Sequence, residues 1–143
     1  DRIVNYDIGY CQNGIYHLNI AKGLCYKMIG EKEMAIKILE TQIAKDTSNV
    51  GLYDNLHLGV LYLETEQYEK AMLTFDQQSI INDLAENTYY KEITFKKINK
   101  YNKFMMNMER AKAQYLSANT MFDNYTHQVD KIFLSDIEAY LTK

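Results

Sequence analysis

A set of small and aromatic residues at helical spacings constrains the fold of this chain more than any other feature. The set consists of Asn55, Leu58, Gly59, Tyr62, Ala71 and Phe75. Leu58 and Tyr62 are four residues apart, so they lie on one face of a helix. Gly59 and Ala71 lack bulk, and helices that carry such residues can approach each other closely. The stretch therefore predicts a hairpin of two helices that buries Phe75.

The same residue types recur in both directions along the chain. Thirty-six residues upstream, the places of Gly59, Tyr62, Ala71 and Phe75 are taken by Gly23, Tyr26, Ala35 and Leu39. Gly30 is expected to mark the turn of this upstream copy. Forty residues downstream, Ala111 and Tyr115 repeat Ala71 and Phe75. Because one hairpin cannot bury its own apolar faces, the recurrence predicts a stack of hairpins with a continuous core.

This arrangement resembles the tetratricopeptide repeat, whose pattern is W-x₂-L-G-x₂-Y followed by A-x₃-F. The stretch 55–75 matches the pattern except that Asn55 stands in place of Trp. The resemblance covers nearly the whole chain and implies one all-α domain, 1–143, folded as a TPR-like α-α superhelix. It implies about three helix hairpins, at about 12–45, 50–83 and 86–122. A capping helix is expected at about 127–141, with the apolar stripe Val129, Ile132, Phe133, Ile137 and Tyr140.

Composition agrees with a folded helical chain. The 143 residues suffice for one domain, and 47% of them are hydrophobic, which argues against disorder. Proline is absent, as suits nearly uninterrupted helix. No apolar run approaches the roughly eighteen residues of a membrane helix, so no membrane contact is expected. The chain starts with Asp1 instead of Met, which suggests a fragment or a processed chain.

The two cysteines indicate a reducing compartment. Cys11 and Cys25 would lie about 21 Å apart on one helix, which is beyond disulfide reach. Neither has a second Cys or His at metal-ligand spacing. Two reduced, mostly buried thiols in a cytoplasmic protein are therefore expected.

No catalytic motif is present in the sequence. His17, His57 and His127 are the only histidines, and each lies in a different predicted helix. There is no HExxH, no phosphate-binding glycine loop, no GxSxG and no CxxC. We therefore expect no enzyme activity, no metal and no cofactor. The net charge of −3 offers no overall attraction to nucleic acid.

The first helices of the hairpins are expected to line a concave binding surface. By helical registry, the residues that would face this groove are His17, Ile20, Leu24, Tyr53, His57, Val60, Glu64, Lys96, Lys97 and Lys100. Such a groove suits a short, partly apolar peptide or protein segment, with the lysines available for a carboxylate. The alternative is that each is an ordinary packed or solvent-facing residue, and that the lysines form a solvated helix face.

A narrower resemblance rests on Val60-Leu61-Tyr62-Leu63 followed by Gln67-Tyr68-Glu69-Lys70-Ala71. These phrases resemble the C-terminal peptide-sensing domains of bacterial quorum-sensing regulators of the Rgg/PlcR/NprR/Rap kind. The resemblance implies the ligand-sensing domain of a transcription regulator that binds a short signalling peptide and forms a homodimer. In that family a helix-turn-helix domain precedes the repeats, so DNA contact would belong to residues before Asp1. The alternatives are a protein–protein scaffold without a peptide signal and a Rap-like regulator of a response-regulator enzyme.

Overall fold

The computed structural model describes residues 8–45, 47–98, 101–121 and 129–142 of the chain. Within these ranges there are seven α-helices, one short 3-10 turn and no strand, which confirms the all-α prediction. The elements, in order, are α2 (Ile8–Met28), α3 (Lys32–Lys45), η1 (Thr47–Asn49), α4 (Asp54–Glu64), α5 (Tyr68–Ile81), α6 (Ala85–Lys97), α7 (Tyr101–Leu116) and α8 (Leu134–Leu141).

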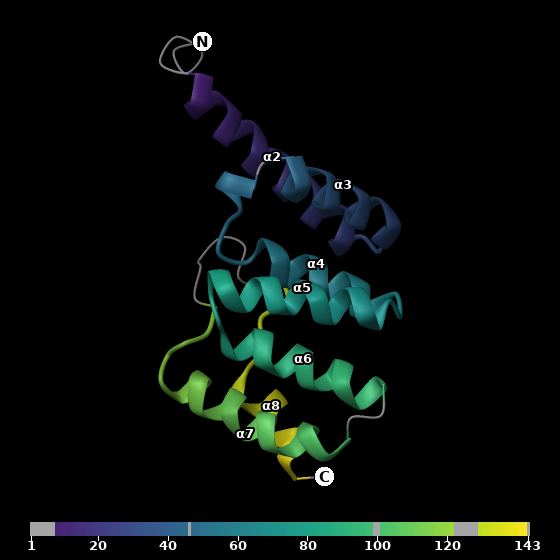
Figure 1. The fold of residues 1–143 in the computed structure, drawn as a ribbon, viewed down its shortest axis with the longest axis vertical. Helices are drawn as coiled ribbons and strands as arrows, with labels where there is room; N and C mark the ends of the chain where they lie inside the picture. The colour runs from purple at the N-terminus through teal and green to yellow at the C-terminus, as the bar shows by residue number, and fades with distance from the viewer. Residues whose placement is uncertain (1–7, 46, 99–100, 122–128, 143) are drawn as a thin grey trace.

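The helices pack as three successive pairs, α2 with α3, α4 with α5 and α6 with α7. Figure 1 shows these pairs stacked in one column, with α2 at one end and α8 at the other. Neighbouring pairs meet through α3 against α4 and α5 against α6, and α8 packs on α7. The first helices of the pairs also touch, because α4 contacts both α2 and α6. These three helices therefore form a shared face along the column.

The turns of the first two pairs show the 36-residue repeat in their backbone geometry. Gly30 has a φ of 88°, and Glu66, thirty-six residues later, has a φ of 63°. In the first turn the N–H of Glu31 donates to the carbonyl of Tyr26. The equivalent bond in the second turn joins Gln67 to Tyr62. In both turns the helix ends in a Schellman motif, in which the residue after the helix has a left-handed backbone conformation. The prediction of a turn at Gly30 is therefore confirmed.

The small residues bring the paired helices together as expected. A Cβ atom on Gly59 would lie only 2.5 Å from Cε1 of Phe75, whose ring is fully buried. At the equivalent position, a Cβ atom on Gly23 would lie 3.3 Å from Cγ of Leu39. Ala35, Leu39, Ala71, Phe75 and Ala111 are all fully buried. The predicted hairpin contacts are therefore confirmed for the first two pairs.

The buried side chains form two clusters that meet at one tyrosine. The larger cluster fills the first two helix pairs, and the smaller one lies among α6, α7 and α8 and includes Met108, Ala111 and Ile137. Tyr90 on α6 packs against both clusters. The core is thus continuous along the column, as hairpin stacking requires.

The third pair turns earlier than expected. We predict its helices at 86–104 and 107–122, whereas α6 already ends at Lys97 and α7 runs from Tyr101 to Leu116. The chain offers no glycine or proline between residues 98 and 107 to mark a turn. Met108 and Ala111 are buried at helical spacing, so their packing sets the position of α7.

Two further expectations are wrong. The predicted capping helix at about 127–141 is shorter, because residues 129–133 are not helical and α8 begins at Leu134; residues 127–128 lie outside the described ranges. Asp130 has a φ of 63°, which a right-handed helix cannot contain. Helix α8 starts where the carboxylate of Asp136 accepts the N–H of Phe133, at 2.8 Å. Cys25 is exposed instead of buried, while the side chain of Cys11 is not described.

Candidate functional site

A non-helical segment of the chain lies on the face that the first helices share. This segment, residues 129–133, is called the strap below, and Figure 1 shows it in yellow, running from α8 behind α6. Four side chains of the face hold it: Lys27 from α2, His57 from α4, and Glu86 and Tyr90 from α6. One or more residues from each helix pair thus contact the same short segment.

The carboxylate of Asp130 is the central contact of the strap. Its Oδ2 atom lies 2.5 Å from Nζ of Lys27 and 2.7 Å from Nδ1 of His57. Nζ of Lys27 also donates to the carbonyl of His57, at 3.3 Å. The side chains of Lys27 and Asp130 are each only 7% exposed, and that of His57 is 2% exposed. The contact is therefore a desolvated carboxylate site with two donors.

The protonation of this site follows from its surroundings. Burial acts to raise the pKa of Asp130, but the hydrogen bond from His57 and the positive charge of Lys27 outweigh it and hold the pKa below its usual value. The carboxylate is thus ionised at neutral pH and can only accept hydrogen bonds. Both Lys27 and His57 therefore act as donors towards it.

The backbone of Asp130 makes a separate contact with α6. The hydroxyl of Tyr90 donates to the carbonyl of Asp130 at 2.9 Å. Burial, together with the nearby Asp130 charge, raises the pKa of Tyr90, so the hydroxyl keeps its proton. The left-handed backbone of Asp130, with φ at 63°, accompanies this arrangement. Aspartate tolerates that conformation better than most residues.

Glu86 forms a second charged contact beneath the strap. This side chain is fully buried, and its Oε1 atom accepts the N–H of Met121 at 3.1 Å. Its Oε2 atom accepts from Oγ1 of Thr120 at 2.6 Å, from Nζ of Lys131 at 3.3 Å and from the N–H of Ile132 at 3.4 Å. These partners offset the cost of burying the charge. Glu86 therefore joins the strap to the segment after α7.

Apolar side chains anchor the strap on either side of its charged pair. Val129 packs against the larger core cluster, and Ile132 is 2% exposed within the smaller one. Between them, Nζ of Lys131 lies 5.0 Å from the ring centre of Tyr115 and 5.5 Å from that of Phe133. The order of the strap is thus apolar, acidic, basic, apolar, and each of these four residues has a matching contact.

Several of the residues predicted to line an open groove are not exposed. Ile20, Leu24 and Val60 belong to the larger core cluster, and His57 lies beneath Asp130. Their expected exposure is wrong, because the helix face that they occupy packs into the core or under the strap. Tyr53 is half-buried and also packs against that cluster.

The remaining predicted site residues lie apart from the strap contacts. His17 is exposed, with its ring centre 5.3 Å from that of Tyr16. Glu64 is exposed and lies 3.9 Å from Nζ of Lys32. Nζ of Lys96 lies 5.9 Å from the ring centre of Tyr140 on α8. Lys97 is exposed, and Lys100 lies outside the described residues. Of the described residues, Lys27 and His57 contact the carboxylate of Asp130, whereas Lys96 and Lys97 do not.

Four residues of the site were not expected from the sequence: Lys27, Glu86, Tyr90 and Asp130. The sequence did contain a sign that Asp130 and Lys131 make buried contacts. Asp130 and Lys131 interrupt the apolar residues Val129 and Ile132, and charges within an apolar stripe require partners when they are buried. The partners themselves are remote in sequence, since Lys27 and Asp130 are 103 residues apart.

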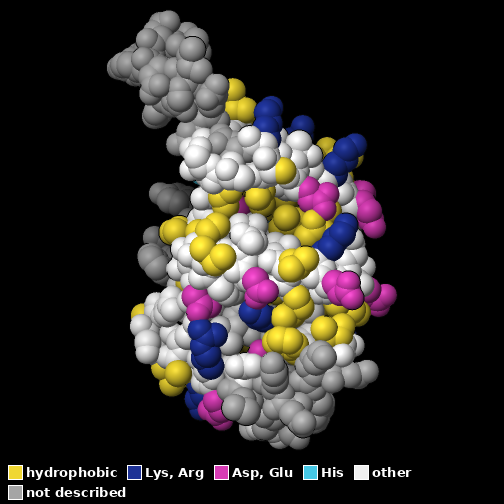
Figure 2. All heavy atoms as spheres, viewed as in Figure 1, with side chains coloured by type: hydrophobic (Ala, Val, Ile, Leu, Met, Phe, Trp, Pro, Cys, Tyr) yellow, Lys and Arg dark blue, Asp and Glu magenta, His cyan; other side chains and the backbone are white. Residues whose placement is uncertain are grey.

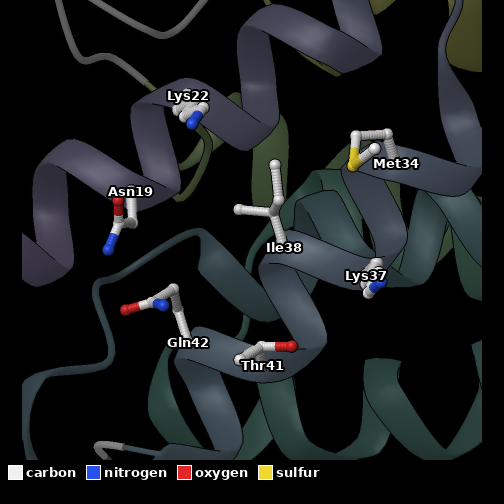
Figure 3. A pocket seen from close by; sticks show the side chains of 7 residues that line it. All are labelled: Asn19, Lys22, Met34, Lys37, Ile38, Thr41 and Gln42. Carbon is white, nitrogen blue, oxygen red and sulfur yellow. The ribbon is translucent and has the colours of Figure 1, made fainter.

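A hollow between α2 and α3 is a further concave feature of the described residues. Figure 3 shows its lining side chains, which are Asn19, Lys22, Met34, Lys37, Ile38, Thr41 and Gln42. It holds about 230 Å³, below the roughly 300–1,000 Å³ of typical ligand pockets. It contains two lysines but no acid, so it offers no acid–base pair. The described part of the chain has no cluster of side chains suited to a metal ion.

No family model, curated protein or solved structure matches this chain. Among the helices of the described ranges, none combines the length and apolar character needed to cross a bilayer.

Proposed function

We propose that this chain is a TPR-like binding module whose helices α2, α4 and α6 bind a short peptide or protein segment in a non-helical conformation. The strap is the observation that carries this proposal. It shows that one side chain from each of these helices can contact a single short segment: Lys27, His57 and Tyr90. Recognition of this kind combines backbone contacts for affinity with side-chain contacts for specificity.

Both kinds of contact are available on this face. Tyr90 donates to a backbone carbonyl and Glu86 accepts a backbone N–H, so these contacts do not depend on the ligand side chains. Lys27 and His57 together bind a carboxylate, which is a side-chain or C-terminal feature of the ligand. A peptide with a suitably placed acidic group fits this combination better than a neutral small molecule.

Repeat geometry supports the TPR-like class. The equivalent turns at Gly30 and Glu66, and the equivalent contacts of Gly23 and Gly59, recur at a spacing of 36 residues. On the residue pattern described above, we extend the proposal to the ligand-sensing domain of a transcription regulator. In that role a signalling peptide shifts the domain between two arrangements and, in a homodimer, changes the geometry of attached DNA-binding domains.

A peptide titration tests the binding function. Isotope-labelled chain is titrated with a library of short peptides that vary in charge, and the backbone amide signals are followed by NMR. We expect acidic peptides to shift signals of α2, α4 and α6 more than those of α3 and α5. A Lys27→Met variant should lose this response, whereas Lys45→Met, which removes an exposed lysine from α3, should keep it. Failure of every peptide at millimolar concentration would contradict the proposal.

One observation favours a second candidate, a scaffold that holds a folded protein without a peptide signal. Leu73 and Ile80 on α5 are 67% and 79% exposed and share a helix face, and Ile81 beside them is 41% exposed. Figure 2 shows hydrophobic side chains at the surface in the middle of the column. A pull-down that recovers one stoichiometric protein, and loses it with the Leu73→Lys and Ile80→Lys variants, would favour the scaffold.

A further inference from the structure

The strap and the face beneath it are complementary in charge order. Along the face, the two donors Lys27 and His57 lie under Asp130, and the carboxylate of Glu86 lies under Lys131. Apolar contacts for Val129 and Ile132 stand on either side. The face therefore selects a segment in which an acidic residue precedes a basic one, flanked by apolar residues.

Departure of the strap alone would be costly. It would remove the strap partners of Lys27 and Glu86, whose side chains are 7% and 0% exposed while the strap covers them, and both charges would have to be hydrated instead. A segment that replaces the strap restores these contacts when it carries charges in the same order, which favours it over a segment without them.

The backbone conformation of the strap favours its replacement by a separate peptide. Asp130 lies in the left-handed backbone region, with φ at 63°, a conformation that glycine adopts without strain and that aspartate adopts at a smaller cost than most other residues. A separate peptide can present its carboxylate to Lys27 and His57 without being tied to α8. Such a peptide can thus make the same contacts without the connection that holds the strap in this conformation.

We propose that the strap is an internal occupant of the ligand site, and that the ligand is a peptide with the order apolar, acidic, basic, apolar. Binding of this peptide requires the strap to leave α2, α4 and α6. This inference rests on the proposed peptide-binding function and specifies both its ligand class and its control. Only molecules whose strap is released can bind the peptide. The apparent Kd is therefore the intrinsic Kd divided by the fraction of molecules in which the strap is released.

The test compares the full chain with its Asp130→Asn variant. The substitution keeps the shape of the side chain but removes the charge that Lys27 and His57 bind. The probes are the blocked peptide Val-Asp-Lys-Ile-Phe and its Asn-containing counterpart. The N–H groups of Met121 and Ile132 report strap release by hydrogen exchange, because both donate to Glu86. Asp76→Asn is the matched control, since Asp76 forms an ion pair with Lys91 on the surface.

We expect Asp130→Asn to speed exchange at Ile132 and to bind the Asp-containing peptide about tenfold more tightly than the native chain. Asp76→Asn should match the native chain, and the Asn-containing peptide should bind neither protein. Tyr90→Phe removes only the hydroxyl that donates to the carbonyl of Asp130. It should also speed exchange at Ile132 and tighten peptide binding, but less than Asp130→Asn does. Circular dichroism establishes that each variant is folded.

Two results would overturn the inference, and they differ from each other. If peptides bind the native chain and Asp130→Asn equally, without changing exchange at Ile132, the strap does not occupy the ligand site although peptide binding stands. If exchange at Ile132 rises in the variant but no peptide binds either protein, the strap is a structural element and the binding function fails with it.

Discussion

At the scale of single residues, the two equivalent glycines should respond differently to the same substitution. A Cβ atom on Gly59 would meet the buried ring of Phe75 at 2.5 Å, whereas one on Gly23 would meet Ile38 at 3.2 Å and Leu39 at 3.3 Å, distances that need only a few tenths of an ångström of adjustment. Ile38 is only half-buried and can shift. We expect Gly59→Ala to lower the free energy of unfolding by about 1–3 kcal/mol despite the better helix propensity of alanine.

Gly23→Ala is the matched substitution and should change the free energy of unfolding by less than about 1 kcal/mol, because propensity and crowding nearly cancel. Urea unfolding followed by circular dichroism measures both variants. Equal losses at the two positions would show that the close approach at Gly59 does not limit the packing of α4 on α5.

Asp130 makes stability depend on pH in a defined direction. Its pKa is lower in the folded chain than in the unfolded chain, because the contacts with His57 and Lys27 favour the ionised form. The contribution to stability is therefore complete above the unfolded pKa of about 3.9 and is lost as the pH falls through the folded value. Asp130→Asn should be less stable than the native chain at neutral pH, and the difference should shrink below about pH 4.

Urea unfolding at a series of pH values measures this difference. Asp76→Asn serves as the control, because a surface ion pair contributes only about 0–1 kcal/mol. A difference between the native chain and Asp130→Asn that stays constant down to pH 2 would show that the carboxylate is not held in its ionised form by the fold.

At the scale of structural elements, the two repeat turns differ in a way that predicts a stabilising substitution. Glu66 occupies the left-handed position that Gly30 fills one repeat earlier. Glycine avoids the steric cost of that conformation, so Glu66→Gly should raise the free energy of unfolding by about 0.5–1 kcal/mol. Thermal unfolding checks the direction. Gln77→Gly, at an exposed position inside α5, should instead lower it by about 1 kcal/mol.

The elements that the sequence predicts well are those with local markers. Gly30 and the paired small residues locate the first two hairpins closely, because turn geometry and close helix contact require them. The third turn has no such marker between residues 98 and 107, so its position depends on tertiary packing. The stripe of Val129, Ile132 and Phe133 resembles a helix face, but Val129 and Ile132 pack into two different clusters.

At the scale of the whole molecule, the sequence indicates part of the helix face that holds the strap but not the strap itself. The registry of the first helices places His57 on the face that holds the strap. The contact of Lys27 with Asp130 spans 103 residues, and nothing in the local pattern of either residue identifies the other. Long-range pairing of this kind is decided by the path of the chain after α7, which helical periodicity does not describe.

That long-range contact changes how the column should open. In a stack of repeats each hairpin is held mainly by its neighbours, so α2 and α3 at one end should open first. The strap adds a direct link from α2 to the segment before α8, through Lys27 and Asp130.

Lys27→Met should therefore speed amide exchange in α2 and α3 much more than in α6 and α7. Lys22→Met, at an exposed position on α2, should leave amide exchange in all four of these helices unchanged. Exchange that rises equally along the whole column would mean that Lys27 contributes to global stability and does not fasten the first hairpin to the strap.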